Sequence, residues 1–160
     1  MDERFLSKTY SVRKLAEADA EAVCEIEYGN PIYYLYQPVE ITPERVKEDI
    51  VALPPGKMRD DKYYVGYFDG ETFVAIMDLV LGYPDERTAF IGFFMMNAAR
   101  SGCGEGSAIV KEIKAALKVA GYTGIRLGVD NGNPQSGAFW RKNGFSVVEI
   151  KDYIVMYCRI

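Results

Sequence analysis

The alternation of hydrophobic and polar residues predicts a sheet whose early strands are antiparallel. Strands are expected at 10–15, 62–68, 72–81 and 88–97, and the last three form a meander. Asp69-Gly70 lies between two of these strands and predicts a two-residue type I′ hairpin turn. A short strand at 125–129 follows later in the chain, and two more, at 145–150 and 153–159, end it.

Hydrophobic residues three and four positions apart predict helices between these strands. Asp19 can cap a first helix that ends before Pro31, and Thr42-Pro43-Glu44 has the cap, proline and acid of a helix start. A helix that runs to Ala120 has the clearest apolar face, and Pro134 begins another that ends at Gly144. One strand-helix-strand crossover therefore interrupts an otherwise antiparallel order.

Residues 32–39 do not follow this pattern. They contain three tyrosines, Tyr33, Tyr34 and Tyr36, between two prolines, and we do not expect a regular helix there. One interpretation is a packed surface loop. The other is an aromatic wall of a substrate pocket, because tyrosine offers apolar area with a polar tip.

Composition narrows the class of protein. The chain has 160 residues, as expected of one domain spanning 1–160, and its net charge of −4 argues against general nucleic-acid binding. It has no histidine, which excludes Ser-His and Cys-His triads, and its three cysteines show no metal-binding spacing, so no metal site is expected. Without an evident signal peptide or membrane-spanning run, we expect a cytoplasmic protein with no membrane contact.

A glycine-rich loop precedes the central helix. Gly102, Gly104 and Gly106 would let backbone N–H groups approach a ligand, and the helix N-terminus adds partial positive charge, so the loop could cradle a diphosphate. A tight glycine turn without a ligand is the simpler alternative. A dinucleotide site is another, since Asp130 follows the next strand, although the glycine spacing and the single crossover differ from that fingerprint.

Two motifs at this separation resemble the GNAT superfamily of N-acetyltransferases. Gly104-Glu105-Gly106 matches the end of the family's Gln/Arg-x-x-Gly-x-Gly/Ala motif, and Asn133, Trp140 and Gly144-Phe145 match its late signature. The element order fits nearly the whole chain. The resemblance implies an α/β (α+β) fold with a single mixed sheet, mostly antiparallel, one central crossover and about four flanking helices.

The resemblance also implies a site for acetyl-CoA. Backbone groups of Phe94 and Met96 would pair with the pantetheine arm, and a backbone N–H near Met95 or Met96 would stabilise the oxyanion. Asn133 would hydrogen-bond the pantetheine or the nearby loop. The pyrophosphate would be held by the amides of Ser101, Gly102, Cys103, Gly104, Glu105, Gly106 and Ser107.

Two positions depart from the family pattern. The Gln/Arg position is Ser101, with Arg100 one residue early, and the late aromatic residue, often a tyrosine that protonates the departing thiolate, is Trp140. An indole N–H can donate a hydrogen bond but cannot usefully supply that proton. The general acid would then be another tyrosine, a water or no specific group.

Asp78 is the expected general base or amine-binding carboxylate. It interrupts the apolar strand 74–81, where burial would raise its pKa toward a useful value. A strand-edge position facing water and a structural hydrogen bond are the alternatives. Asp130 and Glu86 are weaker choices because both lie in turns.

These features together predict an acetyl-CoA-dependent N-acetyltransferase that transfers acetyl directly to an amine of a small molecule or peptide. The tyrosines at 33, 34 and 36 would contact this acceptor. The alternatives are a CoA-binding protein without transferase activity and, less favoured, a nicotinamide or flavin nucleotide enzyme. Family members often pair, so a homodimer is compatible with the resemblance.

Overall fold

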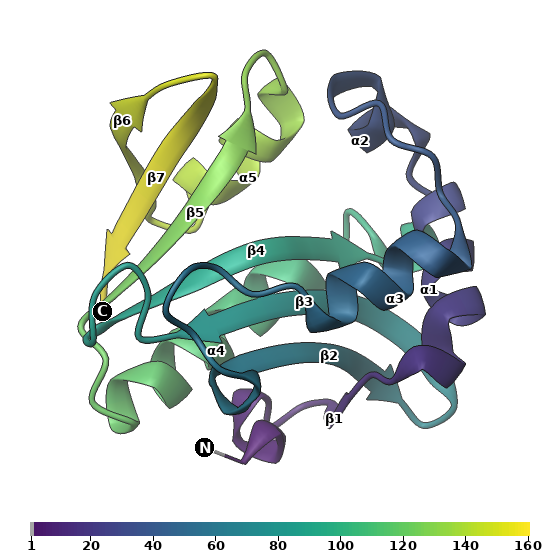
Figure 1. Cartoon of the computed structure of the whole chain (residues 1–160), viewed down its shortest axis with the longest axis horizontal. Helices are drawn as coiled ribbons and strands as arrows, with labels where there is room; N and C mark the ends of the chain where they lie inside the picture. The colour runs from purple at the N-terminus through teal and green to yellow at the C-terminus, as the bar shows by residue number, and fades with distance from the viewer. Residues whose placement is uncertain (1) are drawn as a thin grey trace.

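Seven strands form one mixed sheet in the computed structural model, which describes residues 2–160. The order is β1-β2-β3-β4-β5-β7-β6, and every neighbouring pair is antiparallel except β4 and β5 (Figure 1). The predicted mixed sheet with one parallel crossover is confirmed. The strands are β1 (Ser11–Lys14), β2 (Lys62–Asp69), β3 (Thr72–Leu81), β4 (Thr88–Met96), β5 (Gly124–Asp130), β6 (Ser146–Ile150) and β7 (Tyr153–Arg159).

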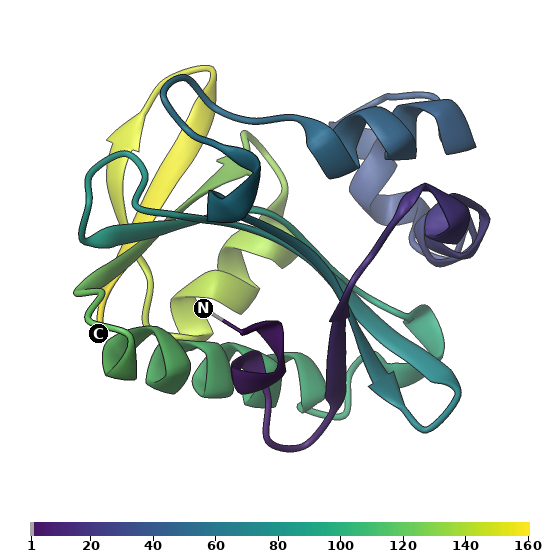
Figure 2. The ribbon, with the colours of Figure 1, turned by 60° about the horizontal axis from the view of Figure 1, so that its bottom comes forward.

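Helices cover both faces of the sheet. Figure 2 shows α4 along one face and α2 and α3 on the opposite side. Short 3₁₀ turns, η1 (Glu3–Leu6), η2 (Glu17–Asp19), η3 (Arg59–Asp61) and η4 (Ala98–Arg100), complete the connections. The α-helices are α1 (Ala20–Tyr28), α2 (Pro31–Tyr36), α3 (Pro43–Val51), α4 (Glu105–Val119) and α5 (Pro134–Lys142).

Strand alternation divides the core into two clusters. Odd positions of β2, such as Tyr63 and Val65, face α4, whose Ile113 and Leu117 are fully buried against the sheet. Burying each such aliphatic side chain stabilises the fold by roughly 1.5–3 kcal/mol. Tyr64 faces the other way and packs with the cluster of α1 and α3. Both faces of the central strands are therefore covered, but by different helices.

The expectation that residues 32–39 form no helix is wrong. Pro31 occupies the first position of α2, where a missing N–H costs no helical hydrogen bond. The helix ends at Tyr36, and Gln37 has left the helical region because Pro38 disfavours helical geometry in the residue before it. The two prolines therefore delimit a short helix rather than excluding one.

The expected turn at Asp69-Gly70 is displaced by one residue. Asp69 pairs with Thr72, so the two-residue loop is Gly70-Glu71. Gly70 has a φ of 58°, and no described non-glycine residue has a positive φ. A type I′ turn needs positive φ at both central residues, whereas a type II′ turn needs it only at the first. The loop thus has the glycine position of a type II′ turn.

The parallel strands β4 and β5 separate after a short ladder. They pair only from Thr88 opposite Gly124 to Ile91 opposite Leu127; β5 continues beside β7, and β4 continues beside β3 (Figure 1). A bulge in β4 marks the separation, because Gly92 is passed over in the pairing with β3. The diverging strands open the edge of β4 at the centre of the molecule.

Candidate active site

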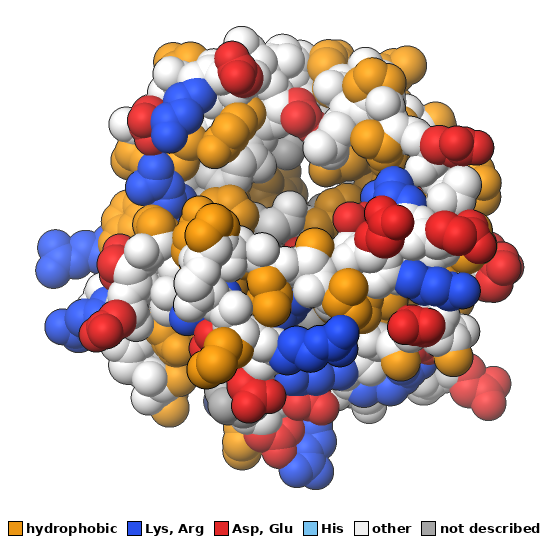
Figure 3. All heavy atoms as spheres, in the orientation of Figure 1, with side chains coloured by type: hydrophobic (Ala, Val, Ile, Leu, Met, Phe, Trp, Pro, Cys, Tyr) orange, Lys and Arg blue, Asp and Glu red, His pale blue; other side chains and the backbone are white. Residues whose placement is uncertain are grey.

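Two cavities adjoin along β4. The first, which we call the glycine groove, has a volume of about 390 Å³ and is lined by Phe94, Met96, Gly104, Gly106, Asn133 and Trp140, among others. The second, the acidic cavity, has a volume of about 490 Å³ and includes Glu27, Arg45, Asp49, Lys62 and Asp78. Tyr33 of α2 lines both. The space-filling view is hollowed between α2 and the part that carries β5 to β7 (Figure 3).

The start of α4 presents backbone donors to the glycine groove. Gly102 and Gly104 have φ values of 80° and 85°, which L side chains rarely adopt. Gly104 is the N-cap, and it has no side chain to satisfy the N–H groups of the first turn. The first helical bond runs from the Ala108 N–H to the Gly104 carbonyl, over 3.0 Å. The preceding amides and the helix dipole form a cradle suited to a phosphate.

Glu105 does not place its negative charge in this cradle. Its carboxylate accepts a hydrogen bond from Arg100 Nε at 2.9 Å and one from the Tyr10 hydroxyl at 2.8 Å. These bonds hold the pKa of Glu105 below its usual range. Glu105 and the exposed Cys103 are the two predicted loop residues whose side chains do not line the groove.

The edge of β4 offers backbone groups to the groove. The Asn97 N–H donates to the Val74 carbonyl at 2.8 Å, and antiparallel ladders alternate bonded and non-bonded pairs. By this alternation, Met95 bonds to β3, whereas Phe94 and Met96 direct their N–H and C=O groups toward the diverging β5.

Two asparagines already use part of their hydrogen-bonding capacity at the groove. The Met96 carbonyl accepts the side-chain amide of Asn30 at 2.9 Å. Asn133 caps α5, because its Oδ1 accepts the Ser136 N–H at 3.1 Å. The carboxamide oxygen of Asn133 therefore has a structural role, and Asn30 is a groove residue that the sequence did not single out.

Trp140 forms an apolar floor. It is buried, and its ring centroid lies 5.0 Å from Phe139, 5.0 Å from Phe145 and 5.9 Å from Phe94. Such edge-on and tilted contacts stabilise aromatic clusters. The side chain that replaces the family's frequent tyrosine is thus a packing residue that also faces the groove.

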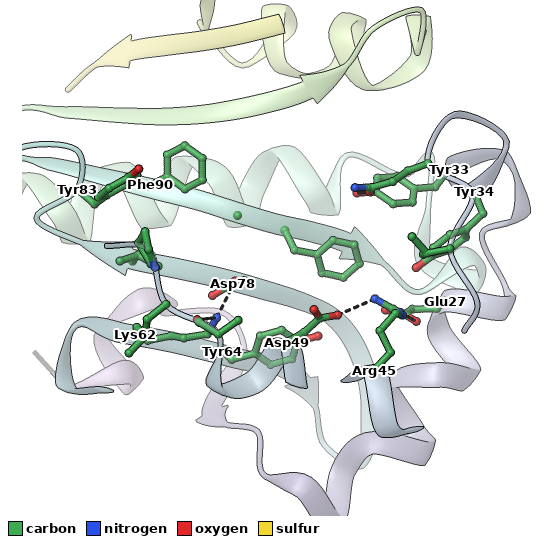
Figure 4. Close-up of a pocket in the computed structure, with 18 residues that line it drawn as sticks. Glu27, Tyr33, Tyr34, Arg45, Asp49, Lys62, Tyr64, Asp78, Tyr83 and Phe90 are labelled. Carbon is green, nitrogen blue, oxygen red and sulfur yellow. Dashed lines mark hydrogen bonds and ion pairs between the residues drawn. The ribbon is translucent and has the colours of Figure 1, made fainter. Parts of the chain in front are cut away.

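The acidic cavity holds two ion-pair systems (Figure 4). Arg45 of α3 lies between Glu27 of α1 and Asp49, with a guanidinium–carboxylate distance of 2.6 Å to Asp49. Lys62 Nζ lies 3.0 Å from Asp78 Oδ2 and donates to the Ala52 carbonyl at 2.6 Å. Each cation is therefore already paired.

Asp78 combines burial with a free acceptor. It lies in β3, a central strand, so the strand-edge alternative is wrong, and its side chain is 16% exposed. Burial raises the pKa of Asp78, and the charge of Lys62 opposes this rise. The Oδ1 atom is buried without a hydrogen-bond partner. A Cβ on Gly92 would lie 3.0 Å from Oδ2, so the glycine at the bulge leaves room for this carboxylate.

The three predicted acceptor tyrosines do not lie together. Tyr33 and Tyr34 line the acidic cavity, but Tyr36 does not and is partly exposed. The Tyr33 hydroxyl donates to Gln37 Oε1 at 2.8 Å, and its ring lies edge-on to Phe93. Burial raises the pKa of Tyr33 and of Tyr34, so both phenols are protonated at neutral pH.

Four charged residues of the acidic cavity were missed in the sequence: Glu27, Arg45, Asp49 and Lys62. Of these four, Glu27 is the residue whose burial could have been predicted from the sequence. It lies four residues after Val23 on the apolar face of α1, and it is 1% exposed. An acid on a buried helix face needs a cation from elsewhere in the fold.

The residues described contain no cluster of metal-ligating side chains. No helix between residues 2 and 160 has the length and apolarity to cross a bilayer.

Comparisons with known proteins agree with this architecture. The model of the acetyltransferase (GNAT) family matches residues 23–145. An acetyltransferase from Thermus thermophilus is 22% identical and superposes with a TM-score of 0.82, covering 95% of this chain and 97% of its own. PaiA N-acetyltransferase from Thermoplasma acidophilum, solved in complex with coenzyme A, is 19% identical with a TM-score of 0.71, covering 94% and 99%.

A third structure with the same fold is the ribosomal-protein-S18-alanine N-acetyltransferase from Escherichia coli. It is 14% identical with a TM-score of 0.69, and the match covers 94% of each chain. No curated protein sequence matches this chain.

Proposed function

Because the chain belongs to the acetyltransferase (GNAT) family, we propose that it is an N-acetyltransferase that uses acetyl-CoA and acetylates an amine of a small molecule or peptide directly. The observation that carries this proposal is the junction at β4. A backbone cradle for phosphate lies on one side of it, and a cavity with an unpartnered carboxylate oxygen lies on the other.

The glycine groove fits acetyl-CoA. The uncapped amides at the start of α4 would hold the pyrophosphate, and the outward backbone groups of Phe94 and Met96 would pair with the pantetheine as an added strand. Of the two expected oxyanion donors, the Met96 N–H is the one directed toward the groove, because Met95 is bonded to β3; since the Met96 carbonyl already accepts from Asn30, this single N–H would serve either the pantetheine or the oxyanion. When bound, acetyl-CoA supplies an acetyl group already activated as a thioester.

Asp78 would prepare the acceptor. An amine must lose a proton to become nucleophilic, and Asp78 is a cavity-lining carboxylate whose raised pKa brings its basicity closer to that needed at neutral pH. Lys62 on Oδ2 fixes the orientation of the carboxylate. Because Oδ1 is buried, the proton would reach this carboxylate through a water or after a small shift of the side chain.

A CoA-binding protein without transferase activity is the second reading. It is favoured by one observation, the replacement of the frequent family tyrosine by Trp140, which is buried in an aromatic cluster. Among the described residues of the groove, Tyr33 is the phenol that borders both cavities, and its hydroxyl is engaged by Gln37.

Thiol release from acetyl-CoA with a broad panel of primary amines separates the two readings. A transferase releases thiol in an amine-dependent reaction and yields the acetylated amine by mass spectrometry. Acetyl-CoA binding without any amine-dependent release would overturn transferase activity and leave the binding-protein reading.

A further inference from the structure

We propose that the acidic cavity selects an arylalkylamine or a similar amine that has an apolar body and bears no carboxylate. This inference rests on the proposed N-acetyltransferase activity and names the acceptor class. It excludes free amino acids, which bring a carboxylate next to the reacting amine.

The charges of the acidic cavity disfavour an anionic acceptor. Glu27, Asp49 and Asp78 provide three carboxylates, whereas Arg45 and Lys62 provide two cations. The two cations are already bonded, Arg45 to Glu27, Asp49 and the Glu40 carbonyl, and Lys62 to Asp78 and the Ala52 carbonyl. A substrate carboxylate would meet like charges without a free cationic partner, which disfavours its binding.

The cavity also contains two buried polar atoms without a hydrogen-bond partner, and the carboxylate oxygen among them can be satisfied only by a donor. Asp78 Oδ1 is buried and accepts no hydrogen bond, and Tyr34 Oη is buried without a bond of normal geometry although Glu27 is near enough to help raise its pKa. A primary amine carries two or three N–H groups, so it can bond to the Asp78 carboxylate that lines the cavity, directly or through a water that reaches the buried Oδ1. The amine nitrogen therefore belongs at Asp78, beside β4.

The remaining wall is apolar and largely aromatic. Tyr64, Phe90 and Phe93 come from the strands, and Tyr83 packs edge-on against Phe90 with a centroid distance of 5.6 Å (Figure 4). Aromatic walls favour an apolar or aryl body and also attract a nearby cation. A volume of about 490 Å³ accommodates a single aryl ring with a short alkylamine.

A matched set of four acceptors tests this class. The probes are 2-phenylethylamine, phenylalaninamide, phenylalanine and ethylamine, each assayed for kcat/KM by thiol release. We expect 2-phenylethylamine and phenylalaninamide to exceed phenylalanine by at least about tenfold when kcat/KM is expressed per neutral amine, a correction that removes the lower basicity of the amine in phenylalaninamide and leaves the charge of the carboxylate as the difference. We expect ethylamine to be poorer than 2-phenylethylamine because it lacks the ring. Equal or better use of phenylalanine, or of ethylamine, would overturn the proposal.

Asp49→Asn provides the variant test. Asp49 is partly exposed, so the change should preserve the fold, and it both removes one negative charge and weakens a bond that occupies Arg45. The ratio of kcat/KM for phenylalaninamide to that for phenylalanine should fall by several-fold. An unchanged ratio would contradict the electrostatic origin of the selection.

The failures of the two proposals are distinguishable. If the protein binds acetyl-CoA and acetylates other amines of the broad panel but prefers those with carboxylates, the acceptor class is wrong and the transferase remains. If amine-dependent thiol release is absent with every acceptor, the transferase activity itself fails. If 2-phenylethylamine neither reacts nor raises the Tm in the presence of CoA, the acceptor class fails as well.

Discussion

The glycine groove and the acidic cavity differ in the groups that line them: mainly backbone in the groove, and ionised side chains in the cavity. The groove relies on backbone amides, two glycines with positive φ and apolar side chains, mostly from the consecutive segment from β4 to α5, with Asn30, Ile32 and Tyr33 added from the region of α2. The acidic cavity relies on ionised side chains from α1, α3, β2 and β3, which are far apart in sequence. A backbone site serves one constant ligand, whereas a site made of side chains can differ from protein to protein on the same fold.

The largest expected effect of this difference is at Asp78. Replacing it with asparagine removes the proton acceptor, so kcat/KM for the amine should fall by about 10²–10⁴-fold, the usual contribution of a general base. The Kd for acetyl-CoA should stay within about twofold, because Asp78 does not line the groove. Thiol-release kinetics and calorimetry measure the two quantities.

Glu86→Gln is the matched control for Asp78→Asn. Glu86 is an exposed acid in the turn between β3 and β4, so its loss should leave both quantities unchanged. Full activity in Asp78→Asn with the preferred amine would end the role of Asp78 as base.

The acidic cavity should also be the more fragile region. Arg45→Met leaves Glu27, which is 1% exposed, without its cation, and we expect a loss of about 3–5 kcal/mol in the free energy of unfolding. Denaturant melts measure it. The double variant Arg45→Met with Glu27→Gln should recover most of the loss, and equal instability of the single and double variants would disprove the pairing cost.

The groove should respond to backbone changes. Gly104→Glu forces an L side chain to adopt positive φ and adds a negative charge at the cradle, so acetyl-CoA affinity should fall by at least about a hundredfold. Gly121→Glu imposes a similar strain at a φ of 94° after the other end of α4. Calorimetry should show near-normal affinity for this control, and similar losses in both variants would show that strain alone is responsible.

The smallest expected effect is a displacement of the pH profile. The charge of Lys62 opposes the burial that raises the pKa of Asp78, so Lys62→Met should raise that pKa further. Activity requires the ionised carboxylate, and the acidic limb of the kcat/KM profile should therefore move to higher pH. An acidic limb at the wild-type position would contradict the coupling.

The same variant has a stability signature. A carboxyl group whose folded-state pKa exceeds its unfolded value stabilises the fold below the unfolded pKa and loses that contribution as pH rises through the folded value. The Tm of Lys62→Met should consequently fall relative to wild type between about pH 4 and neutrality. A constant difference in Tm across this range would show that Asp78 is not the responsible group.

The sequence predicted the sheet and the groove because both depend on local patterns. Strand alternation, the helix starts at Thr42 and Pro134, and the glycine spacing before α4 each act within a few residues. The helix α2 was missed because two prolines can delimit a helix as well as break one. The turn at Gly70 was displaced because hairpin register, which tertiary pairing sets, decides which residues are central.

The acidic cavity could not be assembled from the sequence. Asp78 was visible because an acid in an apolar strand is unusual, but its partner Lys62 is the first residue of β2 and resembles an ordinary strand boundary. In the sequence, Arg45 resembles a solvent-exposed residue near the start of an amphipathic helix. Its ion pair with Glu27 of α1 is evident only in the folded structure. Such pairs depend on how the helices pack over the sheet, and this packing leaves no pattern among neighbouring residues in the sequence.

The most direct test of the two-site assignment is a calorimetric titration of the purified protein with acetyl-CoA, with NAD as the control ligand. We expect acetyl-CoA to bind at one site per chain and NAD not to bind. A hundredfold excess of acetyl-CoA over its Kd should then stabilise the fold by about 2.7 kcal/mol. Absence of acetyl-CoA binding, or preference for NAD, would contradict the assignment of the glycine groove and remove the basis for acetyl transfer at Asp78.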